Sequence, residues 1–90
     1  MFLDLYDQIR GFKSETPNHF TIAMGELIRT ARIEGNLTQA QLAEKAFMRQ
    51  ATISDIEKGK REPSVSELLS ISFVLRKPLV YFFPKGQAYV

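Results

Sequence analysis

The sequence predicts an all-α fold, a compact bundle of about five helices around one core. Apolar residues recur at steps of three and four along most of the chain, and no segment shows the alternation typical of a half-buried strand. Thr38 with Gln41 and Ser64 with Glu67 form two capping boxes, each of which marks the start of a helix. A chain of 90 residues, 44% of them hydrophobic, can bury a small core without metal or disulfide support.

The first element is an amphipathic helix expected over about residues 2–10, because apolar side chains recur there at helical spacing. The polar segment KSETPNH follows it and has the composition of a linker. We therefore expect an N-terminal helix with its linker, a helical domain and a short tail, at residues 1–19, 20–84 and 85–90.

The domain is expected to open with a helix over about residues 20–34. Its start is open, because Thr16 and Pro17 offer an earlier cap and first helical residue. Gly35 and Asn36 follow the helix, and both residue types tolerate the left-handed conformation that ends many helices.

The remaining elements are shorter. The first capping box starts a helix over about residues 39–46, and the next helix, over about 50–58, ends at Gly59, where a left-handed residue is favourable. The second capping box starts the last helix, which is followed by a final apolar turn over 79–83. That last helix is expected to turn five side chains inward, those of Val65, Leu68, Leu69, Ser72 and Leu75.

The composition excludes several classes of site. The chain has no cysteine, which rules out disulfides, cysteine zinc sites and thiol nucleophiles. No apolar run approaches the roughly 20 residues of a membrane span, and the N-terminal stretch lacks a basic leader, so we expect a cytoplasmic chain without a membrane partner. His19 is the only histidine, and no nucleophile and base are spaced around it. We expect no enzyme, cofactor, metal ion or small-molecule ligand.

The turn over residues 47–49 is too short for an antiparallel hairpin and favours two helices that cross steeply. Small Ala43 allows the close approach. The side chains expected to point into the shared core are those of Leu42, Ala46, Met48, Ile53 and Ile56. The outer edge of helix 50–58 is then polar, and a helix edge of this kind fits the major groove of DNA, about 12 Å wide.

Basic residues gather around this helix, although the net charge of the chain is only +2. Residues 45–61 contain five basic side chains against Asp55 and Glu57. Their position after the helix favours a surface for a polyanion. The alternative is an ordinary solvated loop.

Residues 24–83 resemble the XRE family of phage-repressor-like helix-turn-helix domains. The segments IRTAR, LTQAQLAEKA, TISDIEKGKREPS and ELLSI occur at the positions of that family and in its order. The resemblance implies a lambda-repressor-like fold and a transcriptional regulator, a repressor that binds a palindromic operator in double-stranded DNA as a dimer, with helix 50–58 in the major groove.

The resemblance also implies a role for single positions. Gln50, Ala51 and Asp55 would face base edges, Thr52 would contact either a base or a phosphate, and Gln39 would bind a phosphate. The chemistry agrees for two of them, because a glutamine amide pairs with adenine and a carboxylate accepts from the cytosine amino group. Asp55 has the alternative of pairing with Lys58 or Arg49.

Further roles follow for charged residues. Lys58, Lys60 and Arg61 would lie along the phosphate backbone, where they position the protein rather than specify a sequence. Arg32 and Glu57 match the positions of an internal ion pair in the family; two unrelated surface charges are the alternative.

The chain departs from the family at three places. Phe47 replaces the turn glycine, a position that tends to need a positive φ, so either the backbone shifts or the turn is strained. Arg49 replaces the Ser or Thr cap of helix 50–58, which is reasonable if a DNA phosphate approaches that helix end. Arg76 and Lys77 replace the Gly-Val that commonly follows the last helix.

Large apolar groups near the C-terminus exceed what a small core needs, and they predict a self-association surface. The dimer contact is expected at Phe73, Tyr81, Phe82 and Phe83, with Leu79 nearby and the N-terminal helix as a further part. The alternative is that the N-terminal helix packs on its own chain. A dimer would place two copies of helix 50–58 about 34 Å apart, one turn of DNA.

A second function is compatible with the same fold. Ala51, Asp55 and the altered turn are the features expected of a protein-interaction module, for example an antitoxin, that has lost DNA binding. Among DNA-binding functions, a phage repressor, a restriction-system controller, an antitoxin and the N-terminal part of a longer regulator remain open.

Overall fold

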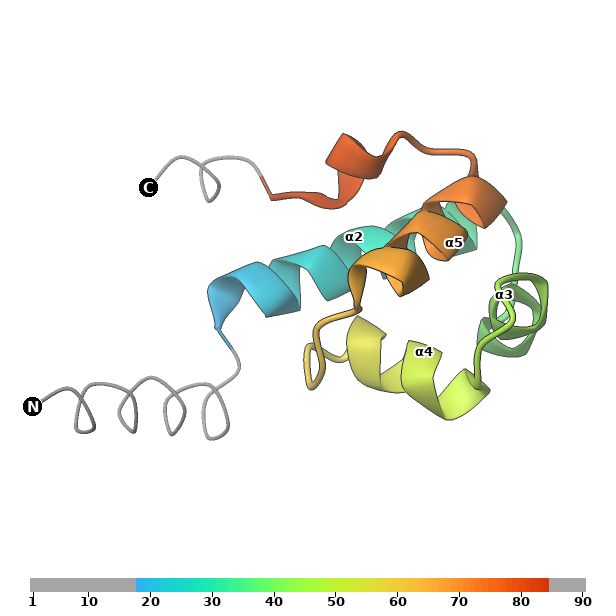
Figure 1. Cartoon of the computed structure of the whole chain (residues 1–90), viewed down its shortest axis with the longest axis horizontal. Helices are drawn as coiled ribbons and strands as arrows, with labels where there is room; N and C mark the ends of the chain where they lie inside the picture. The colour runs from blue at the N-terminus through green and yellow to red at the C-terminus, as the bar shows by residue number, and fades with distance from the viewer. Residues whose placement is uncertain (1–17, 85–90) are drawn as a thin grey trace, which may run out of the picture.

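The computed structural model describes residues 18–84, which form four α-helices and a short 3-10 helix (Figure 1). The elements in order are α2 (His19–Glu34), α3 (Gln39–Lys45), α4 (Gln50–Glu57), α5 (Val65–Leu75) and η1 (Leu79–Phe82). No strand occurs within these residues, so the all-α prediction is confirmed, with four α-helices there in place of about five. The helix expected over 2–10, the pair Thr16 and Pro17, and the tail lie outside the described residues.

The starts of the helices follow local side-chain chemistry. Asn18 caps α2, because its side-chain oxygen accepts a hydrogen bond of 2.8 Å from the backbone N–H of Thr21. The cap is therefore Asn18 and not Thr16, and α2 begins at His19. Both predicted capping boxes are confirmed: in α3 and in α5 the cap side chain and the side chain three residues on each accept the expected backbone hydrogen bond.

A left-handed residue follows each of the four α-helices, and the one after α3 is Phe47 with φ of 57°. Gly59 follows α4 with φ of 77°, as predicted. After α2 it is Asn36, with φ of 61°, that takes this conformation, whereas Gly35 has φ of −83°. Arg76 does the same after α5 with φ of 59°, so the chain keeps the left-handed turn there without a glycine. A side chain at positive φ is less favourable than glycine, so this helix end is strained.

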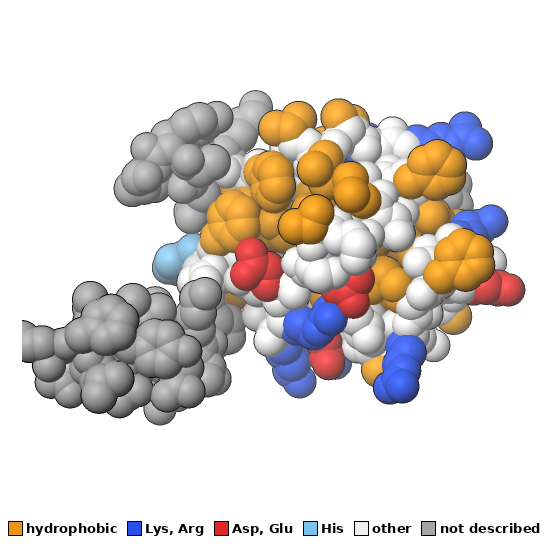
Figure 2. Space-filling view, viewed as in Figure 1, with side chains coloured by type: hydrophobic (Ala, Val, Ile, Leu, Met, Phe, Trp, Pro, Cys, Tyr) orange, Lys and Arg blue, Asp and Glu red, His pale blue; other side chains and the backbone are white. Residues whose placement is uncertain are grey.

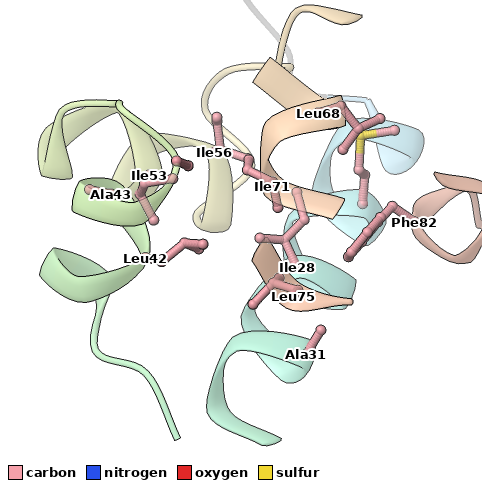
Figure 3. Packing of buried hydrophobic residues seen from close by; sticks show 12 residues of the cluster. Ile28, Ala31, Leu42, Ala43, Ile53, Ile56, Leu68, Ile71, Leu75 and Phe82 are labelled. Atoms are coloured by element: carbon pink, nitrogen blue, oxygen red, sulfur yellow. The ribbon is translucent and has the colours of Figure 1, made fainter. Parts of the chain in front are cut away.

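One hydrophobic core joins all five elements, and Figure 3 shows its side chains converging from the helices and from η1. The fully buried residues with the largest side chains are Phe82, Met24, Ile28, Leu42, Ile53, Ile56 and Ile71. Met48, predicted to be inside, is only partly buried against this core.

The inward face of α5 was predicted incorrectly at two positions. Val65 and Leu69 are 74% and 50% exposed, and Ile71 is buried. The reason is that α5 carries apolar residues around most of its circumference, so steps of three and four fit more than one face. Leu68, Ser72 and Leu75 are buried as expected.

The C-terminal aromatic residues divide into core and surface. Phe82 is completely buried and packs edge-to-face on Tyr81, with ring centroids 5.0 Å apart. It therefore belongs to the core of its own chain, and its predicted place in a dimer contact is wrong. Phe83 stacks on Phe20 of α2 at 6.1 Å, whereas Phe73 is 84% exposed. The turn η1 lies across α2 and α5 on the side away from α4 (Figure 1).

Gly25 lets α2 approach the end of α4 closely. A Cβ atom at this position would overlap the carbonyl oxygen of Ile56 and press on the backbone of Glu57. Neither contact is with a flexible side chain, so relief requires a helix to shift. The absence of a side chain at residue 25 thus fixes how deeply α4 sits against α2.

We expect Gly25→Ala to lower the free energy of unfolding by about 2 kcal/mol, the cost of overpacking a tight contact. Thermal or urea denaturation measures this change. Gly35→Ala is the matched control. A Cβ at residue 35 would lie 3.4 Å from its nearest neighbour, the Ala31 carbonyl oxygen, and Gly35 has a φ of −83°, which alanine adopts readily. Equal stability of the two variants would contradict a close contact at residue 25.

Candidate nucleic-acid interface

Helix α4 is held from behind by two other helices. It packs against α2 and α3, and its inward side chains Ile53 and Ile56 are fully buried. On the opposite side Gln50 and Ala51 are exposed, and the main contacts of α4 within residues 18–84 are those with α2 and α3. The arrangement presents one edge of a short, braced helix to solvent (Figure 1).

The four predicted base-reading residues lie along this edge. Gln50 and Ala51 are exposed at the start of α4, and Thr52 and Asp55 are half-buried farther along it. At about 100° per residue, these positions form a broad outward strip, with Ala51 and Asp55 near its middle and Gln50 and Thr52 at its two margins. The strip can donate and accept hydrogen bonds and can also contact an apolar group.

The turn before α4 keeps a left-handed residue despite its sequence. Phe47 has φ of 57°, and its side chain is 95% exposed. Of the two alternatives for this turn, the strained one is observed, at a cost of roughly 1–3 kcal/mol for a bulky residue in this conformation. Hydrogen bonds hold the turn in place; in one of them the backbone N–H of Met48 donates to the Ala43 carbonyl oxygen at 2.8 Å.

Arg49 occupies the cap position of α4 without capping it. Its side chain makes no cap hydrogen bond and is exposed. Its carbonyl oxygen accepts from the backbone N–H groups of Thr52 and Ile53 at 3.1 and 3.2 Å. A cation therefore stands at the positive end of the helix dipole, which is unfavourable unless an anion shares the position.

A buried ion pair ties α4 to α2. Arg32 Nε donates to Glu57 Oε2 at 2.6 Å, and a second guanidinium N–H donates to Glu57 Oε1 at 3.0 Å. The Glu57 side chain is 2% exposed and that of Arg32 is 11% exposed. Arg32 also donates to the Leu37 carbonyl oxygen at 2.8 Å, so the guanidinium is bonded on both sides. The alternative of two unrelated surface charges is inconsistent with this geometry.

Gln39 belongs to the same network. Its side-chain N–H donates to Glu57 Oε1 at 3.1 Å, and the residue is only partly buried. One N–H of the amide is thus used inside the protein, and the amide group is held at the start of α3. The second N–H is the one that a phosphate would need.

The basic residues after α4 differ in how they are held. Lys58 and Lys60 are exposed. Arg61 donates to Glu67 Oε2 at 2.9 Å, an ion pair at the surface that sequence reasoning missed. The hydrogen bond from Arg61 lowers the pKa of Glu67, and the same bond raises the pKa of Arg61. Arg61 therefore has a competitor for any phosphate, whereas the two lysines form no ion pair within residues 18–84.

Asp55 forms no ion pair within residues 18–84, with either Lys58 or Arg49. The predicted alternative of a pairing inside the protein is therefore not observed in this part of the chain.

Residues 18–84 contain no group of three metal-ligating side chains, and none of their helices has the length and hydropathy needed to cross a membrane.

The Helix-turn-helix family profile matches residues 28–82, more than half of the 90-residue chain. The chain belongs to the XRE-type helix-turn-helix family. An immunity repressor protein of Bacillus phage phi105 is 39% identical over 54 residues, which are 60% of this chain and 38% of the repressor. The chain thus spans well under half the length of that relative.

Two solved structures extend the comparison. PlcR of Bacillus thuringiensis, in complex with the peptide PapR7 and DNA, is 34% identical with a TM-score of 0.64, covering 68% of this chain and 21% of PlcR. SinR, a master regulator for biofilm formation in complex with DNA, is 30% identical with a TM-score of 0.64, covering 66% of this chain and 95% of SinR. SinR is a regulator by name, both structures contain DNA, and both share the helical fold of this chain over about two thirds of its length.

Proposed function

We propose that this XRE-family domain is a transcriptional repressor that binds double-stranded DNA by inserting the outer edge of α4 into the major groove. The observation that carries the proposal is the exposed polar strip on α4, braced by α2 and α3 and flanked by Lys58 and Lys60. Its setting would be the cytoplasm. The phage repressor similarity and the two DNA complexes among the related structures support it.

In this proposal Gln50 and Asp55 read base edges, Ala51 and Thr52 contribute apolar or hydroxyl contacts, and the remaining groups bind the backbone. The proposed phosphate ligands are Gln39, Arg49, Lys58, Lys60 and Arg61. A bound phosphate would also explain why an arginine occupies the unfavourable cap position of α4. The phosphate would contact both the Arg49 guanidinium and the free backbone amides at that helix end.

We further propose that the repressor binds a palindromic operator as a dimer. One copy of α4 covers only a few base pairs, and two copies about 34 Å apart would read two half-sites on one side of the duplex. Of the aromatic residues predicted for the contact, Phe73 and Phe83 keep exposed surface, at 84% and 36%, and Tyr81 is half-buried.

The competing function is a protein-interaction module that keeps the fold and has lost DNA. Its support is Phe47, an aromatic ring fully presented to solvent beside the candidate interface. Binding to random duplex DNA at low salt separates the two functions, because phosphate contacts give non-specific affinity that falls steeply as salt rises. Retention that is absent at low salt would favour the interaction module.

Gln50→Ala is expected to change the operator sequence obtained by selection from a random duplex library. A glutamine amide discriminates adenine from other bases by about 1–3 kcal/mol, so one position of each half-site should lose its preference. Selection with the unchanged chain gives the reference. Glu44→Ala is the control, because Glu44 is exposed on α3 and has no proposed base contact. An unchanged consensus in the Gln50 variant would show that other residues read the sequence.

A further inference from the structure

The carboxylate of Glu57 joins three helices at one buried point. Its Oε1 accepts a hydrogen bond from the Arg32 guanidinium of α2 at 3.0 Å and another from the Gln39 side-chain N–H of α3 at 3.1 Å. Glu57 itself is the last residue of α4, and its side chain is 2% exposed. The bond to Gln39 therefore connects a residue that holds the fold together with a residue proposed to bind the DNA backbone.

The chemistry of the two groups fixes how the Gln39 amide is turned. An ionised carboxylate has no hydrogen to donate, so only the nitrogen end of the amide can face it. A glutamine without such a partner can present either its oxygen or its nitrogen to a neighbour. In this protein the nitrogen is held at Glu57, and its second N–H is not used by that carboxylate. Gln39 is only partly buried, so its side chain still reaches the surface.

The negative charge of Glu57 is matched inside the protein. Arg32 donates to both carboxylate oxygens, through Nε at 2.6 Å and through a second N–H at 3.0 Å. Figure 2 shows Lys and Arg side chains over α4 and the loop after it, on the lower part of the visible face. A bare carboxylate near such a surface would repel DNA, whereas a two-pronged ion pair carries no net charge. Glu57 can therefore orient a donor for a phosphate without repelling the phosphate.

We infer that Glu57 is a positioning residue for DNA binding, which holds the Gln39 amide with its second N–H ready for a phosphate. The inference rests on the proposed function, in which Gln39 is a phosphate ligand. A long polar side chain normally loses rotamer freedom when it binds a partner. For Gln39 this loss occurs when the chain folds, so DNA meets a donor that is already ordered. Glu57 does not contact the DNA itself and acts through Gln39.

The chain without DNA provides the first test, because an ordered amide is a property of the free protein. Side-chain ¹⁵N relaxation of the full chain should give the Gln39 amide an order parameter near the value of about 0.85 typical of rigid backbone. Gln50 is the control, because it is exposed at the start of α4, and its amide should fall below about 0.6. Equal mobility of the two amides would overturn the inference.

The affinity for a random duplex provides a second test, in which the direction of the change decides. Glu57→Gln keeps the shape of the side chain and removes its charge. If Glu57 influenced DNA only through its charge, this variant would bind the polyanion more tightly. We expect weaker binding instead, by about threefold to tenfold, the range of one lost hydrogen bond. Glu44→Gln is the matched control, because Glu44 is exposed on α3, and it should show no loss of affinity.

A double-mutant cycle separates positioning from damage to the fold. Gln39→Ala should weaken binding by a similar factor, and adding Glu57→Gln to it should cause no further loss, because the side chain that Glu57 positions is then absent. A loss that persists in the Gln39→Ala background would come from disturbed helix packing and would overturn the positioning role. Circular dichroism at the temperature of the binding assay shows whether each variant is folded. If Glu57→Gln does not fold, the relaxation measurement on the unchanged chain decides.

Failure of the proposed function gives a different result. A chain that does not bind random duplex at low salt refutes that function, and the positioning role with it. A chain that binds DNA while the Gln39 amide is mobile, or while Glu57→Gln binds as tightly as the unchanged chain, refutes the positioning role alone.

Discussion

Glu57→Ala is expected to lower the free energy of unfolding by about 3–5 kcal/mol, because it leaves the buried Arg32 guanidinium without its carboxylate. The Glu57 side chain accepts three hydrogen bonds, two from Arg32 and one from Gln39, and only 2% of it is exposed. For a domain of this size the midpoint of thermal unfolding should fall by more than about 12 °C. Differential scanning calorimetry gives the midpoint, and urea titration gives the free energy.

Two further variants show whether the loss comes from the stranded charge. Arg61→Gln breaks the exposed pair with Glu67 and should cost no more than about 1 kcal/mol. Arg32→Met combined with Glu57→Leu replaces both charges by apolar groups and should recover much of the stability lost in the single variant. A double variant no more stable than Glu57→Ala would indicate that the pair stabilises by its hydrogen bonds to α3 and to the Leu37 carbonyl rather than by mutual charge compensation.

Helix starts and the identity of the exposed α4 edge were predictable because they depend on local chemistry. A capping box is satisfied within four residues, and both boxes occur where they were expected. Asn18 was missed as the cap of α2 because Thr16-Pro17 offers a second start two residues earlier, and sequence alone does not rank two adjacent caps. Because Ile53 and Ile56 are buried, the opposite side of α4 must face outward. The spacing of the residues between Gln50 and Asp55 relative to these two isoleucines therefore predicts which of them are on the outer side.

Errors arose where several partners compete for one residue. In α5 seven of the eleven residues are apolar and they surround most of the helix, so periodicity did not show that Val65 and Leu69 face outward. Phe82 was assigned to a dimer surface because the core was expected to be full without it, yet its ring fills the space between α2 and α5 under η1. The Arg61–Glu67 pair was missed because Glu67 already had a role in its capping box, and a carboxylate has two oxygens.

The Arg61–Glu67 pair changes what is expected of the basic residues on DNA. The two lysines have no such competitor within residues 18–84, so each can approach a phosphate without first breaking a contact there. Arg61 must give up its ion pair with Glu67 to bind a phosphate. Its net contribution to DNA affinity is therefore the difference between the Arg61–phosphate pair and the Arg61–Glu67 pair. Affinity should therefore depend more on Lys58 and Lys60 than on Arg61, although all three follow α4 and carry the same charge.

We expect Lys58→Ala with Lys60→Ala to weaken binding to duplex DNA on the order of a hundredfold at 0.1 M salt, since each phosphate contact contributes about 0.9 in the logarithm of affinity per decade of salt. The slope against log salt should fall by about 1.8 for the pair. Fluorescence anisotropy with a labelled duplex, titrated at several salt concentrations, measures both quantities. The loss should be similar for operator and random sequences, because phosphate contacts carry no base preference.

Arg61→Ala is the matched comparison for that variant and should weaken binding much less than either lysine substitution. Glu67→Gln removes the competing charge and should strengthen binding, because Arg61 then meets a phosphate without losing an ion pair. Its side chain keeps an oxygen for the backbone N–H of Ser64, so the cap of α5 is retained. If Arg61→Ala were as damaging as the lysine pair and Glu67→Gln had no effect, the pair with Glu67 would not persist in the DNA complex, and Arg61 would bind phosphate at full strength.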